Sequence, residues 1–434
     1  MFSEAISLFW QRVRNHFIIV KNSFWLIGSE FVAKLVLFGV VVLLARYLGA
    51  EGYGRLQFAL SFASVFALVM DLGFNTLTNR ELAREKEKYD LFVPNVSFVK
   101  LGLFVVSLIV MTAFLLLTDR SFEVIVLCIL AVCYYLFSSF IEFYKSVFQA
   151  FEKMQLNAFS RLLYCALLFS GLLLLMNKKA GVLAIMLGYL GANFITFLFT
   201  LFLLLRYIRP FSLKISPAFI KTMFKMVFPF MILYIAAIIN FRVDTIMISY
   251  LLSDAAVGLY ALAVNIIMAA AFIPAFCCAA AYPSLSRFGI SSPRKLFLMF
   301  KGMLWIMLLI GALGAVVVLL LAKPLVLVVF GSQFIDSVPV LQILAASFFL
   351  SGGVLLMGYT AIAIDRQAFY TKVVVMSVLI NVVLNYFFIS WHGIKGAAIA
   401  TVIAQLISFA VLSFFLCRRG FFFFSSVPTE PRLK

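Results

Sequence analysis

Apolar stretches of about 20 residues recur along the whole chain and are separated by short polar or turn segments. A helix of that length crosses the ~30 Å hydrocarbon core of a bilayer. Since no water bonds to peptide groups in that core, a spanning segment must be a helix or a strand of a closed barrel. The stretches lack the alternating pattern of barrel strands. The chain is therefore expected to be an all-α polytopic membrane protein.

Composition agrees, because 65% of the 434 residues are hydrophobic, 12% are charged and the mean hydropathy is +1.14. No single short apolar segment precedes a polar chain, so no cleavable signal is expected. About 12 transmembrane helices are predicted, approximately at Ser23–Leu48, Leu56–Leu77, Val93–Leu117, Glu123–Phe148, Ala158–Met176, Val182–Leu205, Met226–Leu252, Gly258–Tyr282, Met299–Leu321, Ser337–Ile362, Lys372–Ile389 and Ala397–Cys417.

The basic residues predict the orientation. The net charge is +18, and most of the 35 lysines and arginines fall at the two termini and in the loops on the same side. The positive-inside rule places both termini in the cytoplasm. The charge also suits attraction to anionic headgroups, and it carries no signal of nucleic-acid binding.

The chain is expected to form two six-helix lobes. The basic, proline-containing segment 207–225 predicts a cytoplasmic linker between lobes 1–206 and 226–417, followed by a cytoplasmic tail, 418–434. "YLGAEGYGRLQFAL" aligns with "LLSDAAVGLYALAV" at an offset of 204, and Gly181–Arg206 aligns with Gly393–Arg418 at 212. Because each half has an even number of spans, the repeats are parallel, related by a pseudo-two-fold along the membrane normal, and face a central cavity.

Ala45–Glu85, "ARYLGAEGYGRLQFALSFASVFALVMDLGFNTLTNRELARE", resembles the hallmark region of a known family. The aromatic-Leu-Gly turn, the following Tyr-Gly, the Asp-Leu-Gly and the closing Arg-x-x-Ala-Arg are similar to those of Wzx-type polysaccharide-biosynthesis flippases. These belong to the multidrug/oligosaccharidyl-lipid/polysaccharide exporter superfamily. The resemblance implies translocation of an undecaprenyl-diphosphate-linked oligosaccharide to the outer leaflet. It also implies a role in making O-antigen or a similar surface polysaccharide in the cytoplasmic (inner) membrane of a bacterial or archaeal cell, with polysaccharide polymerase and chain-length machinery as partners. Two six-helix lobes around a cavity are expected to move the substrate by alternating access.

Such a substrate requires cations at membrane depth, because unshielded phosphate charge in hydrocarbon is very costly. Lys34 lies about 12 residues into the first span, ~18 Å along the helix, and Arg242 about 16 residues into the seventh, ~24 Å along. Both are candidate phosphate contacts. Lys34 could equally be neutralised by Glu30, four residues earlier. For Arg242 the alternatives are an interhelical ion pair or snorkelling to the interface.

Other polar residues in the spans are open to two interpretations. Asp244 is two residues from Arg242 and therefore points away from it, so a structural or ion-coupling role is as plausible as contact with sugar. Asn240 is included as a substrate contact because it accompanies Arg242, although amides also hold helices together. Asp71 is expected to be structural, and Lys100 an ordinary charge near a span end.

Several activities are set aside. The chain has no GxxxxGK[ST] loop, and its cysteines and histidines lack metal-ligand spacing, so neither a cofactor nor a metal site is expected. A coupling ion, proton or sodium, is left open. The alternatives to a flippase are a multidrug or other lipid-precursor exporter of the same superfamily and, less favoured, a membrane-embedded glycan polymerase or ligase. The latter enzyme would need a larger outer loop than this sequence offers. We expect no catalysis.

Overall fold

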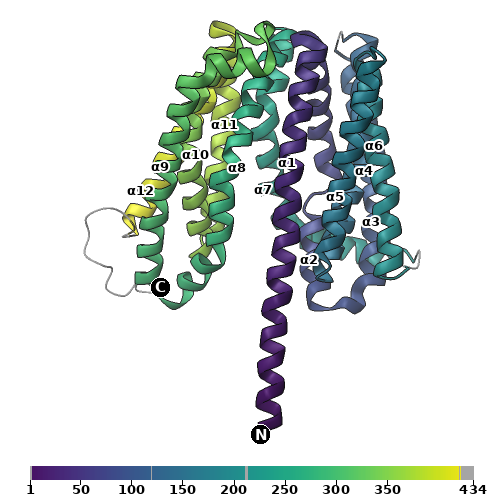
Figure 1. Ribbon diagram of the computed structural model, residues 1–434, viewed down its shortest axis with the longest axis vertical. Helices are drawn as coiled ribbons and strands as arrows, with labels where there is room; N and C mark the ends of the chain where they lie inside the picture. The colour runs from purple at the N-terminus through teal and green to yellow at the C-terminus, as the bar shows by residue number, and fades with distance from the viewer. Residues whose placement is uncertain (1, 119, 211–213, 420, 422–434) are drawn as a thin grey trace. The chain divides into compact units, whose positions relative to one another are not determined.

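The computed structural model describes the backbone of residues 2–118, 120–210, 214–419 and 421 (Figure 1). Side chains are described for residues 25, 28–118, 120–210, 214–228, 231, 242–419 and 421. Every regular element in these ranges is helical. The α-helices are α1 (Phe2–Ala67), α2 (Phe74–Arg84), α3 (Tyr89–Leu116), α4 (Phe122–Ala150), α5 (Met154–Asn177), α6 (Val182–Tyr207), α7 (Pro217–Leu251), α8 (Asp254–Ser291), α9 (Pro293–Leu325), α10 (Ser337–Ala363), α11 (Gln367–His392) and α12 (Ile394–Arg418).

Ten helical stretches of the described chain are long and apolar enough to cross a membrane. One of them, Gly28–Met70, is 43 residues long and contains most of the first and most of the second predicted span. Gly49 separates these two spans, with φ 70° and ψ 179° inside α1. The seventh predicted span lies in α7, where many side chains are outside the described set. The all-α polytopic fold predicted from the sequence is therefore confirmed.

The second predicted span is interrupted near its end. A short 3-10 turn, η1 (Leu68–Met70), follows α1, and α2 begins only at Phe74. Leu72 and Gly73 both have positive φ, 44° and 94°, so the chain leaves the helical path there and re-enters it. A break in a spanning helix frees backbone groups that the surrounding protein must bond.

The helices form two compact units, which are considered one at a time. The first comprises Met1–Leu43 and Phe62–Tyr234, and the second comprises Leu44–Ser61 and Ile235–Lys434. The division thus falls inside α1 and inside α7. These bounds differ from those of the lobes 1–206 and 226–417, which stay a prediction from the sequence. Helix α7 begins at Pro217, so the predicted linker 207–225 is partly helical.

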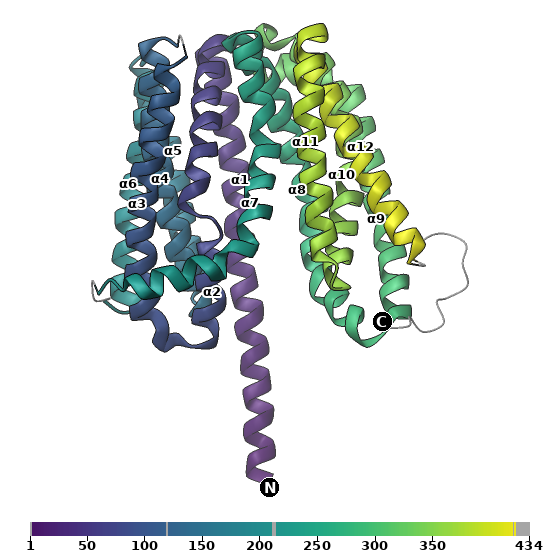
Figure 2. The ribbon, with the colours of Figure 1, turned by 180° about the vertical axis from the view of Figure 1, so that it is seen from behind.

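In the first unit, α4 lies at the centre and packs against α2, α3, α5 and α6 (Figure 2). Its buried face includes Phe143 and Phe148, both fully inaccessible. Helix α6 carries Gly188 where it meets α5, and a Cβ there would come 2.8 Å from Leu175 Cδ1. Small residues at such crossings let membrane helices approach closely.

In the second unit, α10 is the central helix and packs against α8, α9 and α12, while α11 lies along α12. One core cluster joins Phe300 of α9, Leu356 of α10 and Leu412 of α12, all buried. Gly311 of α9 meets the backbone of α10, since a Cβ would lie 2.6 Å from the carbonyl oxygen of Phe349.

Leu44–Ser61 joins the second unit through a reciprocal glycine contact. A Cβ on Gly54 would overlap the carbonyl oxygen of Asp254, and a Cβ on Gly258 would overlap that of Ala50. Gly258 and Asp254 follow Gly54 and Ala50 by the offset of 204 seen in the sequence. The two repeat-related motifs therefore pack against each other symmetrically, as a pseudo-two-fold requires.

Side chains reinforce this attachment. Arg46 donates from Nε to the carbonyl of Val329 at 2.7 Å and bonds the carbonyl of Val328 through its terminal nitrogen. Asn265 of α8 donates to the Tyr53 hydroxyl at 2.8 Å. The second unit therefore holds the segment by backbone contact at the glycines and by hydrogen bonds on either side of them.

The glycine contact predicts the effect of one methyl group. Gly54→Ala should lower the free energy of unfolding by about 1–3 kcal/mol, because the clashing atom is backbone and cannot rotate away. Gly102→Ala is the control, since its Cβ would meet nothing within 4 Å. Thermal unfolding of the purified proteins in detergent measures both changes. Equal unfolding midpoints for the two variants would contradict the close backbone contact.

Candidate functional site

The most completely bonded buried carboxylate in the described second unit is that of Asp244 on α7, which is only 7% exposed. Three helices donate to it. Tyr260 of α8 donates to Oδ2 at 2.6 Å, and Asn385 of α11 donates to Oδ1 at 2.6 Å. The Thr401 hydroxyl of α12 reaches Oδ2 at 2.9 Å. Hydrogen bonds to a charged group offset much of the cost of burying it.

The surroundings of Asp244 are rich in oxygen and poor in positive charge. Asn381 Oδ1 accepts from Asn385 Nδ2 at 3.0 Å, and Asn385 Oδ1 is buried without a hydrogen-bond partner. No lysine or arginine pairs with Asp244 among the described residues. A carboxylate with free neighbouring amide oxygen can hold a proton or a hard monovalent cation. No group of three or more His, Cys, Asp and Glu suited to a metal occurs in the part of the chain that the structure describes.

Arg242 differs from Asp244 in its surroundings. Its side chain is half-buried, and within the described set it makes no hydrogen bond or ion pair. The two side chains are therefore not partners, as their spacing predicted. Asn240, the amide predicted to accompany Arg242, lies outside the residues whose side chains are described.

The first unit carries a charged cluster inside its apolar helices. Glu30 of α1 lies 3.8 Å from Lys34, the pairing that the four-residue spacing offered as one of two alternatives. Arg161 of α5 lies closer, with its terminal nitrogen 3.0 Å from the Glu30 carboxylate. Glu30 and Lys34 are 37% and 44% exposed, so solvent or a ligand can reach them. The Glu142 carboxylate also interacts with the Arg161 guanidinium, so the described charges here are two cations and two carboxylates.

Arg161 is not among the residues predicted from the sequence to bind substrate. It lies within the predicted span Ala158–Met176, close enough to the end to be counted with the interfacial charges. Asn157, one helical turn earlier, is 4% exposed and neither of its amide atoms has a hydrogen-bond partner. The spacing of Asn157 and Arg161 on one helical face is the signal that could have identified a polar stripe on α5.

The expectation for Lys100 is wrong. Its side chain is fully buried in α3, and its ammonium lies 2.8 Å from Ser139 Oγ and 3.4 Å from Asp71 Oδ1. It also lies over the ring of Phe143 at 5.7 Å. Asp71 sits at the break before α2 and accepts from the Asn75 amide at 3.4 Å. Lys100 thus fastens the interrupted second span to α3 and α4, and sequence spacing could not reveal this because the partners are far apart in the chain.

This arrangement predicts a strong asymmetry between single and double substitutions. Lys100→Met should lower the free energy of unfolding by ~3–5 kcal/mol, because it leaves the Asp71 carboxylate without its cation. Adding Asp71→Asn should recover part of that loss. Thermal unfolding in detergent measures both.

Lys145→Met is the matched control for this pair. Lys145 pairs with Glu142 at 2.8 Å, but Glu142 is 49% exposed. Loss of such an exposed pair should change stability by about 0–1 kcal/mol. Equal unfolding temperatures of the two lysine variants would contradict a stabilising role of the buried pair of Lys100 and Asp71.

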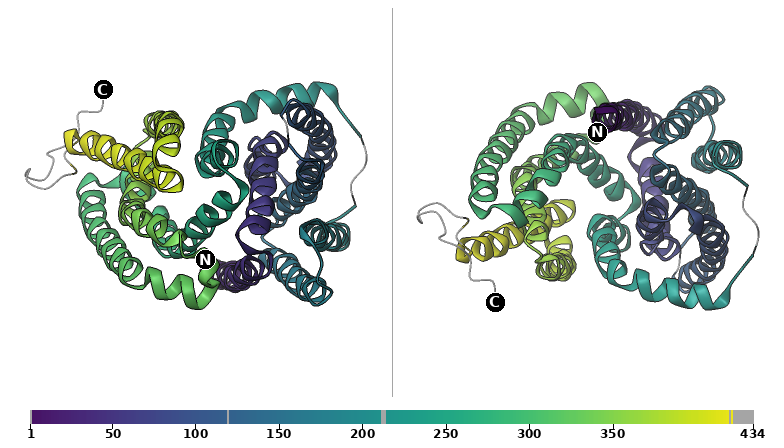
Figure 3. Two further views of the ribbon diagram at one scale, coloured as in Figure 1. Left: turned by 90° about the horizontal axis from the view of Figure 1, so that it is seen from above. Right: turned by 90° about the horizontal axis from the view of Figure 1, so that it is seen from below.

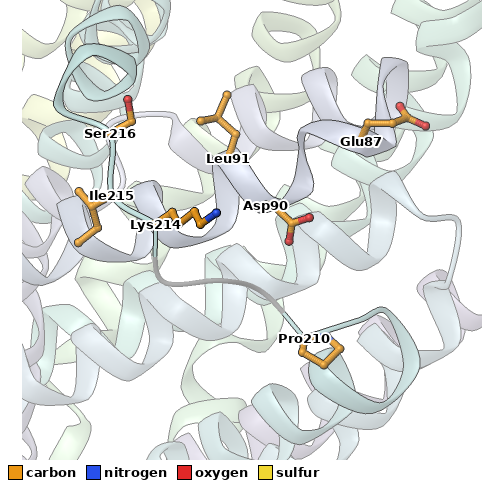
Figure 4. Close-up of a pocket in the computed structure, with 7 residues that line it drawn as sticks. All are labelled: Glu87, Asp90, Leu91, Pro210, Lys214, Ile215 and Ser216. Carbon is orange, nitrogen blue, oxygen red and sulfur yellow. The ribbon is translucent and has the colours of Figure 1, made fainter.

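A pocket of about 740 Å³ lies at the edge of the first unit (Figure 4). Glu87, Asp90 and Lys214 supply its charges, and Pro210 and Leu91 are among its apolar lining. It contains none of the predicted substrate-binding residues. Its lining residues come from the start of α3 and from the segment that precedes α7.

Comparison with known proteins identifies similar sequences and folds. The family described as "Polysaccharide biosynthesis protein" matches residues 19–289. A comparison with curated protein sequences finds no match.

Three solved structures illustrate the likeness of fold. A lipid II flippase MurJ in an inward closed conformation has a TM-score of 0.77 at 18% identity, covering 91% of this chain and 88% of that one. An inward-facing multidrug resistance MATE family transporter of the MOP superfamily gives 0.69 at 15%, covering 87% and 94%. The MATE transporter VcmN of Vibrio cholerae in its bent form gives 0.56 at 14%, covering 92% and 99%.

Proposed function

Because the chain belongs to the polysaccharide biosynthesis protein family, as the motifs of Ala45–Glu85 predicted, we propose that it is a flippase for a lipid-linked glycan. Its substrate is a polyprenyl-diphosphate-linked oligosaccharide repeat unit, which it moves from the cytoplasmic to the outer leaflet for surface polysaccharide such as O-antigen. The family match over residues 19–289 carries the proposal. The fold shared with a lipid II flippase supports it.

The charges inside the helices suit a diphosphate. In the first unit, Lys34 and Arg161 both lie beside Glu30, and the Lys34 and Glu30 side chains are 44% and 37% exposed. In the second unit, Arg242 is half-buried and has no partner among the described side chains. A guanidinium can bind two phosphate oxygens at once, and the charge of the ligand offsets the cost of holding the cation at membrane depth. Arg242 and Lys34 are therefore each proposed as phosphate contacts, and Asn240 stays a predicted substrate contact.

Transport is proposed to proceed by alternating access of two lobes, without a catalytic step. The lipid tail can remain in the bilayer, so only the diphosphate and sugars need a polar path. Both termini are proposed to be cytoplasmic, since the basic residues concentrate on that side.

Asp244 is proposed to couple transport to an ion rather than to contact sugar. Its carboxylate already accepts hydrogen bonds from three helices and is only 7% exposed, so it offers a large substrate little surface. A proton or monovalent cation is small enough to bind beside the partnerless Asn385 Oδ1.

The coupling role predicts an ion effect on stability. Sodium, or a change of pH if the ion is a proton, should shift the thermal unfolding midpoint of the purified protein, because a ligand of the folded state alone stabilises it. Asp244→Asn should remove the shift, while Asp254→Asn, which changes a carboxylate at the start of α8, should keep it. A shift that survives in Asp244→Asn would place the ion elsewhere.

A multidrug exporter is the second candidate, because two of the similar folds belong to MATE transporters. Deletion of the gene separates the two functions. Loss of a flippase should abolish surface polysaccharide and leave the lipid-linked repeat unit in the cells, whereas loss of a drug exporter should lower drug tolerance and leave polysaccharide unchanged.

The phosphate-binding role of Arg242 predicts that Arg242→Ala abolishes polysaccharide export at nearly normal protein abundance. Arg242→Lys should retain partial export, because charge remains but the two-pronged geometry is lost. Surface polysaccharide and membrane protein level are measured side by side in the deletion strain.

Two arginines provide controls. Arg294→Ala, at the exposed start of α9, should leave export and abundance unchanged. Arg46→Ala should lower abundance, because Arg46 bonds the backbone of Val328 and Val329. Wild-type export in Arg242→Ala would refute the binding role, and a loss of abundance like that of Arg46→Ala would make Arg242 structural.

A further inference from the structure

The first part of α7, residues 217–228, belongs to the first unit and has one face packed against it. Met223 and Val227 are 0% and 1% exposed, and the ring of Phe219 lies 5.0 Å from that of Phe92 on α3. In Figures 2 and 3 this teal helix runs along one edge of its unit, close to the ends of the unit's helices and strongly tilted to them. Because those helices span the membrane, this stretch lies along the membrane surface.

The opposite face alternates lysines and phenylalanines. Lys221, Phe224, Lys225 and Phe228 occupy positions i, i+3, i+4 and i+7, which share one side of a helix. Phe224 and Phe228 are 39% and 58% exposed, and both lysines are exposed. We name these four residues the Lys–Phe face. Phe224 also touches Phe74 edge-on at 5.6 Å, so its ring is anchored at one side and open at the other.

The segment leading into this helix is fixed to α3. Asn95 accepts a hydrogen bond from the Ser216 amide at 2.8 Å, and the Tyr89 hydroxyl donates to the carbonyl of Arg209 at 2.7 Å. Ser216 in turn accepts from the Phe219 amide at 3.3 Å, which caps the helix. The Lys–Phe face is thus presented by a helix tied at its start and along its inner side.

The charge of this stretch is of one sign. From Lys214 to Val243 the sequence contains no acidic residue. Among the described residues neither Lys221 nor Lys225 forms an ion pair, and Asp90, which lines the pocket beside Lys214, is paired with Arg209 at 3.1 Å. The lysines of the Lys–Phe face therefore offer their charge outward.

We propose that the Lys–Phe face binds anionic phospholipid headgroups. Phe224 and Phe228 enter the boundary between headgroups and acyl chains, and Lys221 and Lys225 extend along it so that their ammonium groups meet the phosphates. Each lysine near an anionic surface contributes about a five-fold gain in affinity, the equivalent of ~1 kcal/mol. The site selects anionic over zwitterionic lipid, and it does not depend on which substrate the protein carries.

The test uses the full-length protein in detergent and measures its affinity for phosphatidylglycerol and phosphatidylcholine by native mass spectrometry. Wild type should prefer phosphatidylglycerol. Lys221→Gln/Lys225→Gln should weaken the tightest phosphatidylglycerol binding by about 25-fold and leave phosphatidylcholine unchanged. Phe228→Ser should weaken both lipids, since it removes apolar contact rather than charge.

Lys178→Gln/Lys179→Gln is the matched control, because it removes two exposed lysines from the turn after α5. It should leave both affinities unchanged. Thermal unfolding of each variant verifies that it is folded. Equal loss in the two double variants would reduce the effect to overall charge and overturn the proposal, and so would wild-type affinity in Lys221→Gln/Lys225→Gln. Absence of a phosphatidylglycerol preference, with cross-linking of an acidic protein to position 225 in cells, would assign the face to a protein partner instead.

Discussion

A polar group of this chain that enters the hydrocarbon is costly unless it finds a partner inside the protein. For the backbone, the helix meets that requirement within each segment, which is why the described elements are all helical. Where the helix stops, other groups take over. Near the interruption at Asp71–Gly73, the Asp71 carboxylate bonds both the Asn75 amide and the ammonium of Lys100. At the other break, Gly49, the glycine supplies the positive φ that lets one spanning segment turn into the next.

The charged side chains inside the helices differ in how they are surrounded. We use this difference to distinguish groups that stabilise the fold from groups proposed to bind a ligand. Lys100 has a carboxylate, a hydroxyl and an aromatic face around it, and it is fully enclosed. Asp244 is enclosed by neutral donors alone, so its charge is solvated without being cancelled. Lys34 and Arg242 remain partly open. A group that is enclosed and paired serves the fold, whereas an open cation at membrane depth is available to an anionic ligand.

The proposed roles draw on both kinds of group. A diphosphate needs open cations, a coupling ion needs a small enclosed carboxylate, and the membrane surface needs exposed lysines beside apolar rings. The open cations and the enclosed carboxylate occur inside the helices. The exposed lysines and rings occur on the first part of α7, which lies close to the ends of the helices of its unit (Figure 2). Glycines at positions 54 and 258 serve a further purpose, because they bring two backbones into contact and relate the two motifs by symmetry.

The sequence by itself determined the membrane setting, the helical class, the approximate spans and the family, because hydropathy, charge and the motifs of Ala45–Glu85 are properties of consecutive residues. Helical spacing also offered the pairing of Glu30 with Lys34 as one of two alternatives for Lys34, and the two side chains lie 3.8 Å apart. Only the tertiary structure decided that Arg161 joins Glu30, that Lys100 is buried on Asp71, and that Asp244 gathers donors from three helices. Those partners are 16 to 157 residues apart and lie on different helices. Spacing along one helix carries no information about which side chains another helix brings to it.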